Sequence, residues 1–157
     1  MSRKKYEEHI EGKIIARNRK ARFNYHIIES WEAGMSLLGS EVKSVRNGKI
    51  NLIDAYCEVE KGEIFLVNAR IAAYKYSNRQ NHAPRRRRKL LLHKGQIKRI
   101  GSKVREKSYT IVPLLVYLKN NGKFKVEIAL AKGKTYHDKR ETIRKKDEKR
   151  LIKKGLL

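Results

Sequence analysis

The chain has 157 residues and carries 40 lysines and arginines against 16 aspartates and glutamates, a formal net charge of +24. This length is typical of one domain, and so large a positive charge is typical of a protein that binds a polyanion rather than a small acidic metabolite. No apolar run is long enough to span a bilayer, and glutamates follow the basic start where a secretory signal needs apolar residues, so we expect a cytoplasmic protein without membrane contact.

The first part of the chain is predicted to hold two short strands around a turn. Residues 1–12 are polar and are expected to be loose, and residues 18–22 favour a short helical turn. The Phe, Tyr and β-branched side chains of residues 23–28 begin a strand. Glu32-Ala33-Gly34 is typical of a turn, after which residues 35–38 return as a second strand.

A short helix is predicted from Gly39. Ser40 is a suitable cap for its first turn, because a serine hydroxyl accepts hydrogen bonds from free backbone amides. Val42 and Val45 lie three residues apart, on the face expected to pack on the core. Asn47-Gly48 then ends the helix.

A hairpin, a loop and a long helix are predicted next. Residues 55–60 and 63–69 flank Lys61-Gly62, a dipeptide typical of a tight β-turn. Residues 78–89 show no apolar periodicity and are expected to form an exposed, mobile loop. Residues 90–107 place apolar side chains on one side at helical spacing and predict a helix.

The clearest hairpin follows, and after it the chain changes character. Residues 109–118 and 123–130 flank Asn120-Asn121-Gly122, and the second arm alternates apolar and charged side chains. Residues 132–157 are strongly basic and hold few apolar side chains. We expect this segment to be disordered in the free protein, with latent helix propensity over 142–152.

These elements predict a mainly β fold. The favoured architecture is a small closed antiparallel barrel of the OB type, with about three flanking helices and a basic C-terminal tail. An α+β sandwich would give a similar sequence pattern. The expected division is a barrel domain over residues 1–131 and the tail over residues 132–157.

Few residues suggest catalysis or metal binding. The single cysteine, Cys57, lies in an alternating strand pattern and is expected to be a buried thiol that forms no disulfide within the chain. The five histidines lack metal-binding spacing. Lys132-Gly133-Lys134-Thr135 resembles the end of a phosphate-binding loop, but Ile128 stands where that loop needs its first glycine. We therefore expect no enzyme, no metal ion and no cofactor.

The strongest signal is a run of five cations, Arg85–Lys89, on the predicted loop. Such a run suits a phosphate backbone, although a solvated loop would have the same sequence. The aromatic side chains near it that can stack on unpaired bases are Tyr74, Tyr76, His82 and His93. The tail has two interpretations: a disordered segment that adds non-specific affinity, or one that becomes helical in an RNA-lined channel.

Several segments, in order along the chain, resemble the family of small protein B, the bacterial transfer-messenger RNA-binding proteins of trans-translation. The resemblance covers residues 14–150. The segments that carry it are residues 18–22 (Asn-Arg-Lys-Ala-Arg), 32–34 (Glu-Ala-Gly), 39–46 (Gly-Ser-Glu-Val-Lys-Ser-Val-Arg), 88–94 (Arg-Lys-Leu-Leu-Leu-His-Lys), 129–134 (Ala-Leu-Ala-Lys-Gly-Lys) and 137–140 (His-Asp-Lys-Arg).

The resemblance implies a partner and a task. The partner is the tRNA-like domain of transfer-messenger RNA (tmRNA), and the task is the rescue of 70S ribosomes stalled on messages without a stop codon. The barrel would clasp the elbow of that domain and replace its missing anticodon arm. The resemblance further implies a monomer that meets small-subunit ribosomal RNA and acts alongside elongation factor Tu.

Two sets of site residues follow. Matching positions place Asn18, Glu32 and Leu91 against the tRNA-like domain. The whole set expected at that RNA surface is Asn18, Lys20, Arg22, Glu32, Lys43, Arg46, His82, Arg86, Arg88, Lys89, Leu91, His93 and Lys94.

The tail set is implied to enter the empty messenger channel, with His137 reaching the decoding bases. Its members are Lys132, Gly133, Lys134, Tyr136, His137, Asp138, Lys139, Arg140, Ile143, Arg144, Lys145, Lys146, Lys149 and Arg150.

Three other functions fit a small basic chain. They are an integral ribosomal protein, a general RNA chaperone that binds by charge, and an RNA-modifying enzyme or nuclease. The third is disfavoured by the lack of carboxylate clusters and metal-ligand spacing in the sequence.

Overall fold

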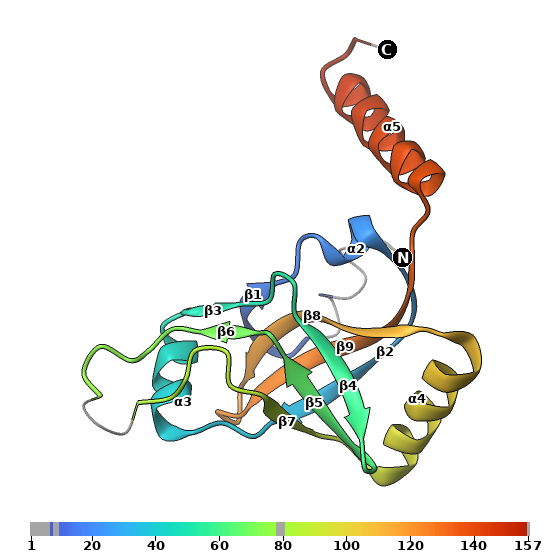
Figure 1. The fold of residues 1–157 in the computed structure, drawn as a ribbon. Helices are drawn as coiled ribbons and strands as arrows, with labels where there is room; N and C mark the ends of the chain where they lie inside the picture. Colours follow the sequence, from blue (N-terminus) through green and yellow to red (C-terminus); the bar gives the residue numbers. More distant parts are fainter. Residues whose placement is uncertain (1–6, 8–9, 78–80, 157) are drawn as a thin grey trace.

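The computed structural model describes residues 7, 10–77 and 81–156, and Figure 1 shows the order of its elements. The strands are β1 (Gly12–Arg17), β2 (Tyr25–Met35), β3 (Ile50–Asn51), β4 (Tyr56–Glu60), β5 (Glu63–Val67), β6 (Arg70–Ile71), β7 (Arg88–Leu91), β8 (Thr110–Lys119) and β9 (Phe124–Gly133). The helices are α2 (Ala21–Asn24), α3 (Gly39–Arg46), α4 (Lys94–Lys107) and α5 (Tyr136–Lys153). The predicted class, mainly β with several helices, is confirmed.

One antiparallel sheet organises the fold. Its seven strands follow the order β1-β8-β4-β5-β7-β2-β9, and β8 also pairs with β9. The two short strands β3 and β6 pair separately. The sequence pattern did not predict β1, β3, β6 or β7 as strands, and Gly12 already belongs to β1 rather than to the loose start of the chain. The rest of the expected loose segment lies mostly outside the described residues.

The two predicted hairpins are confirmed. Glu60 pairs with Glu63 across the β4–β5 turn, where Lys61 and Gly62 both have positive φ angles, of 49° and 75°. A two-residue turn with two positive φ angles matches the twist of the strands it joins, which explains the glycine. The β8–β9 hairpin turns at the predicted residues 120–122.

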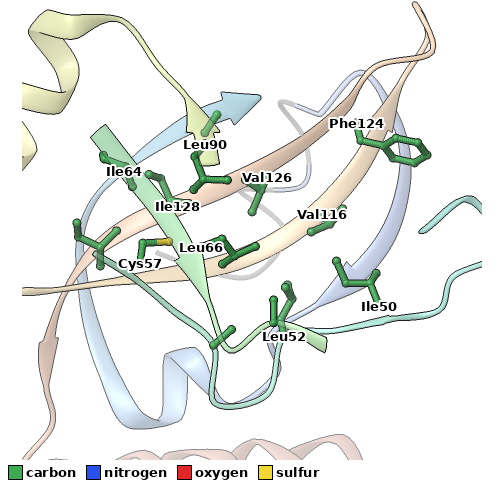
Figure 2. Packing of buried hydrophobic residues seen from close by; sticks show 14 of the residues in the cluster. Ile50, Leu52, Cys57, Ile64, Leu66, Leu90, Val116, Phe124, Val126 and Ile128 are labelled. Atoms are coloured by element: carbon green, nitrogen blue, oxygen red, sulfur yellow. The ribbon is translucent and has the colours of Figure 1, made fainter. Parts of the chain in front are cut away.

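The sheet buries apolar side chains on both of its faces. In the main cluster, drawn in Figure 2, Val126 and Ile128 of β9 pack with Cys57 and Leu66 from the β4–β5 hairpin. A second cluster brings Tyr117 of β8 together with other buried side chains of β8 and β9 and with α2. The expected burial of Cys57 is confirmed, and burial raises the pKa of its thiol.

The first predicted turn is wrong. Glu32-Ala33-Gly34 lies inside β2, which pairs with β9 from Tyr25 to Gly34. A break in the register between Ile27 and Glu29 shifts the alternation of side chains, so the sequence pattern did not reveal a single strand. The predicted start at residue 23 is also too early, because residues 23 and 24 belong to α2.

Two details of the predicted helices also need correction. Helix α4 begins at Lys94 rather than at residue 90, because Leu90 lies in β7 between β5 and β2. Helix α3 has its predicted bounds, but Ser40 does not cap it. Instead, the backbone amide of Leu38 donates to Oε1 of Glu41, 2.9 Å away, at the start of the helix.

No helix in the described part of the chain is both long and apolar enough to cross a membrane.

Candidate nucleic-acid interface

The described residues 81–87 form a largely exposed loop, as predicted, but the prediction is wrong at His82 and Arg88, which are buried, and at residues 88 and 89, which lie in strand β7. Three exposed cations of the Arg85–Lys89 run contact side chains of neighbouring segments. The contacts are Arg85 Nη1 with Asn68 Oδ1 (2.5 Å), Arg87 Nη2 with Glu58 (2.7 Å) and Glu60 (2.6 Å), and Lys89 Nζ with Glu63 (2.6 Å).

Arg88 is fully buried and pairs with Glu41 of α3, itself fully buried. Its other guanidinium nitrogens donate to the carbonyl oxygens of Ala69 (2.8 Å) and Pro84 (3.2 Å). Arg86 completes the network with a 2.5 Å contact to Glu41. Arg88 was predicted to contact RNA, but burial leaves its side chain no surface for that role, and it instead joins β7 to α3.

The protonation of Glu41 follows from this network. Burial raises the pKa of its carboxyl, but hydrogen bonds from Arg86, the Leu38 amide and Arg88 outweigh burial, so the pKa lies below the ordinary value of 4.5. The pKa of Arg88 is lowered by burial, which the hydrogen bond and charge of Glu41 only partly offset.

His82 is also buried, contrary to the predicted exposed loop. One ring nitrogen lies 2.9 Å from Ser40 Oγ and the other lies 2.9 Å from the carbonyl oxygen of Ile71. His82 therefore ties the segment before β7 to α3 and β6. Neither His82 nor Arg88 is available for RNA contact, whereas Lys43 and Arg46 of α3 are exposed as predicted.

Glu32 and Leu91 lie on neighbouring strands, β2 and β7, with Gly34 of β2 opposite Leu91. Leu91 is 53% exposed, unusual for a leucine in a central strand. A Cβ atom at Gly34 would lie 3.1 Å from the Leu91 Cβ, so glycine lets the leucine lie against the β2 backbone. The sequence motif Glu-Ala-Gly thus marks a close strand contact and not a turn.

The Glu32 carboxylate is held in place by β8. Tyr117 donates its hydroxyl hydrogen to Oε2, and Lys119 Nζ lies 2.8 Å from Oε1. The pKa of the Glu32 carboxyl lies below its ordinary value of 4.5. Partial burial alone would raise this pKa, but hydrogen bonds from Lys119 and Tyr117 and the positive charges of Lys119 and Lys125 outweigh the effect of burial. The sequence pattern does not reveal these three partners, and only the register of β2, β8 and β9 identifies them.

Asn18 and the tail helix meet at a second place. The Asn18 side-chain amide donates to the Pro113 carbonyl oxygen at 2.9 Å and fixes the end of β1 against β8. Asn18 and Arg22 line a cavity of about 260 Å³ together with Lys146 of α5. Lys20, also predicted to contact RNA, is exposed where α2 begins.

His93 and Lys94, both predicted to contact RNA, are exposed at the start of α4. Along this helix, Lys94, Lys98 and Arg105 make no ion pair with other described residues. With Lys61 they line a groove of about 500 Å³ whose apolar floor includes Ile97. Positive charge without a protein partner therefore lies on α4 rather than on the Arg85–Lys89 run.

The tail forms helix α5, which projects from the body in Figure 1 and buries none of its residues. It exceeds the predicted range of 142–152, and β9 extends to Gly133, two residues past the predicted domain boundary. Disorder of this segment in the free protein stays a prediction. Exposed members of the predicted tail set are Lys132, Gly133, Tyr136, His137, Arg140, Ile143, Arg144, Lys145, Lys146, Lys149 and Arg150; Lys134, Asp138 and Lys139 are partly buried.

A capping box starts α5. The Asp138 amide donates to Thr135 Oγ1 at 3.3 Å, and the Thr135 amide donates to Asp138 Oδ2 at 3.1 Å. The Thr135 hydroxyl and amide, with a weaker contribution from His26 of β2, lower the pKa of Asp138 to about 2. Lys139 Nζ lies 5.8 Å from the centre of the Phe23 ring of α2, and Asp138 Oδ2 lies 3.4 Å from His26 Nε2 of β2. The first turn of α5 therefore lies beside α2 and β2.

Among the described residues, no three His, Cys, Asp or Glu side chains gather in a way that would hold a metal ion.

Comparisons with known proteins give one consistent result. A family model described as "SmpB protein" matches residues 15–156. The "SsrA-binding protein" of Shouchella clausii is 52% identical over 149 residues, 95% of each chain, and that of Geobacillus thermodenitrificans is 51% identical over 145 residues, 92% of this chain and 93% of the relative.

A solved structure described as "tmRNA-SmpB: a journey to the center of the bacterial ribosome" is 43% identical to this chain. It superposes with a TM-score of 0.65 over 82% of this chain and 94% of the other.

Proposed function

Since the chain belongs to the SmpB protein family, we propose that it binds tmRNA through the tRNA-like domain and delivers it to ribosomes stalled on messages without a stop codon. The observation that carries this proposal is identity of about half of all residues with SsrA-binding proteins over nearly the whole chain. The solved tmRNA–SmpB structure supports the same two partners, tmRNA and the bacterial ribosome.

The proposed RNA-binding body is a closed OB-like barrel. Support comes from the strand pairings, in which β8, β4, β5, β7, β2 and β9 follow one another and β9 pairs again with β8. Closure would leave these six strands without a free edge, which suits a small monomeric domain.

The proposed surface for the tRNA-like domain combines shape and charge. Glu32 and Leu91 supply a fixed carboxylate and an exposed apolar side chain on β2 and β7. Phosphate contacts come from the cations Lys20, Arg22, Lys43, Arg46 and Lys94, while Asn18 and His93 add polar contacts. Arg86 and Lys89 also have exposed surface, but they pair with Glu41 and Glu63 and would share these contacts with phosphates. Such a surface holds a folded RNA by its shape and backbone rather than by reading a linear sequence.

The proposed role of the tail is to test whether the messenger channel is empty. Helix α5 contributes nothing buried to the body, so it is free to exchange its contacts with α2 for contacts with ribosomal RNA. In this proposal His137 reaches the decoding bases, and the cations that follow it contact the walls of the channel.

We propose no enzymatic role, and the relatives are named as binding proteins. The partners further include elongation factor Tu, and the place of action is the cytoplasm, where ribosomes translate. The protein acts as a monomer.

The deciding experiment measures binding of the purified protein to the transcribed tRNA-like domain and to bulk tRNA over a range of salt concentrations. A shape-specific partner stays preferred at every salt concentration, although phosphate contacts weaken both affinities as salt rises. Equal affinity for the two RNAs throughout would favour a general RNA chaperone, and stoichiometric retention on all ribosomes after a high-salt wash would favour a ribosomal protein.

A further inference from the structure

Two tyrosines lie at the surface beside α3, in the segment that follows β6. Tyr76 is 75% exposed, and Tyr74 packs against it edge to face, with 5.6 Å between ring centres and 69° between ring planes. A ring so exposed adds little to the core, so its surface is available to a partner.

Two lysines flank the rings. Lys43 Nζ of α3 lies 5.3 Å from the centre of the Tyr74 ring, and Lys75 Nζ lies 5.8 Å from that of Tyr76. Neither lysine makes an ion pair with another described residue. Both therefore keep their charge available for an anion next to the rings.

Side-chain hydrogen bonds hold the backbone near the Tyr74 ring. The Asn81 side chain accepts from the Tyr74 amide at 3.2 Å and donates to the Tyr74 carbonyl oxygen at 3.0 Å. Ser44 Oγ of α3 donates to the Ala72 carbonyl oxygen at 2.7 Å. These contacts restrain the backbone at Ala72 and Tyr74, and a restrained backbone loses less entropy on binding.

We propose that Tyr76, supported by Tyr74, stacks on an unpaired base of the RNA partner, while Lys43 and Lys75 bind the phosphates next to that base. The proposal rests on the proposed function, because the RNA that it names is the tRNA-like domain of tmRNA. An exposed ring with lysine Nζ atoms 5.3 and 5.8 Å from the two tyrosine ring centres offers both an aromatic surface for a base and positive charge for the backbone of a single-stranded nucleotide. All four bases present such a face, so the platform tolerates different bases.

The test compares two substitutions of one exposed residue. Tyr76→Leu removes the ring, Tyr76→Phe keeps it, and Tyr56→Leu removes another exposed tyrosine, on β4, as a matched control. Since a stacked base contributes appreciably to affinity, Tyr76→Leu is expected to weaken binding of the transcribed tRNA-like domain by about 5- to 150-fold. Tyr76→Phe and Tyr56→Leu are expected to bind within about twofold of the wild type, a margin far smaller than the loss of one stacked base.

The salt dependence separates stacking from charge. Tyr76→Leu is expected to leave the slope of log affinity against log salt unchanged. Lys43→Gln is expected to make that slope shallower by the amount that one phosphate contact contributes. Wild-type affinity for the tRNA-like domain in Tyr76→Leu, with normal preference over bulk tRNA, would overturn the platform and leave the proposed function intact. If the wild type itself binds the tRNA-like domain no better than bulk tRNA, the proposed function is overturned.

Discussion

Arg88 and Glu41, 47 residues apart and both fully buried, form the ion pair that joins strand β7 to helix α3. A buried charge is tolerated only when its partners remain in place, because removing one leaves the other unsolvated and unpaired. The hydrogen bonds from Arg88 to two backbone carbonyls extend the same connection to the segments before and after β6.

Arg88→Met is expected to lower the free energy of unfolding by about 3 kcal/mol, because Glu41 keeps only Arg86 as a charged partner. Urea unfolding followed by circular dichroism measures this. Lys89→Met is the matched control on the same strand, and since the Lys89–Glu63 pair is exposed, it is expected to cost less than about 1 kcal/mol. Equal effects of the two substitutions would show that the buried pair is not a structural connection.

The stability of the protein is expected to depend on the ionisation of Glu41. Its pKa is lower in the folded than in the unfolded chain, so its contribution is full above the ordinary value of 4.5 and is lost as the pH falls through the folded pKa. Unfolding free energies of the wild type and Glu41→Gln are expected to differ most near pH 7 and to converge in acid. A difference that stays constant from pH 7 to acid would contradict the assignment.

Substitutions of two neighbouring leucines of β7 distinguish an effect on stability from an effect on RNA binding. Leu90 is 1% exposed and Leu91 is 53% exposed. Leu90→Ala is expected to lower the free energy of unfolding by about 2–5 kcal/mol through the cavity it leaves. Leu91→Ala is expected to keep the wild-type thermal midpoint and to weaken binding of the tRNA-like domain. If Leu91→Ala binds like the wild type, the exposed leucine is not part of the RNA surface.

Removal of residues 135–157 is expected to spare RNA binding and abolish rescue. The truncation keeps β9, whose Gly133 pairs with Tyr25, and keeps the hydrogen bond from the Lys134 amide to the Asn24 carbonyl oxygen. Affinity for the tRNA-like domain and release of stalled ribosomes in a purified translation system are the two measurements. A truncated protein that no longer binds the RNA would contradict the separate roles of body and tail.

Two threonines test the start of α5. Thr135→Ala removes the capping hydroxyl and is expected to cost the helix about 1 kcal/mol, which lowers the helical population of residues 136–153. Thr142→Ala is the control, because alanine inside a helix has the higher propensity and should preserve or raise that population. Cα chemical shifts of the tail report both. If the two variants show the same shifts, the capping box does not determine the helix.

Local patterns predicted the elements that depend on local chemistry. The alternation of charged and apolar residues in Phe124–Leu130 and the glycine after Asn121 were sufficient for the β8–β9 hairpin. The Arg85–Lys89 run was misinterpreted because the partners that bury or neutralise it come from β4, β5 and α3, far away in sequence. A run of cations in the sequence does not show which of its side chains points into the protein. The pairing of β7 with β5 shows that this side chain is Arg88.

Gly34 illustrates the second limit. Glycine is common in turns, so Glu32-Ala33-Gly34 favoured a turn, whereas in the sheet Gly34 is needed for the approach of Leu91. At the candidate site, the resemblance supplied Glu32 and Leu91 but not Tyr117, Lys119 or Lys125. Those three are recognisable only once the strand register places them beside the carboxylate.

The internal pairing of the Arg85–Lys89 run also affects how the protein meets its RNA. Because four glutamates cancel much of this charge, the run contributes less to the long-range attraction of an RNA than the cations elsewhere in the chain. Cations spread over several elements accelerate diffusional encounter more than they orient the molecule. After the first collision, the short-range fit between protein and RNA determines which face of the protein binds. Added salt is therefore expected to lower the association rate far more than it changes the bound orientation.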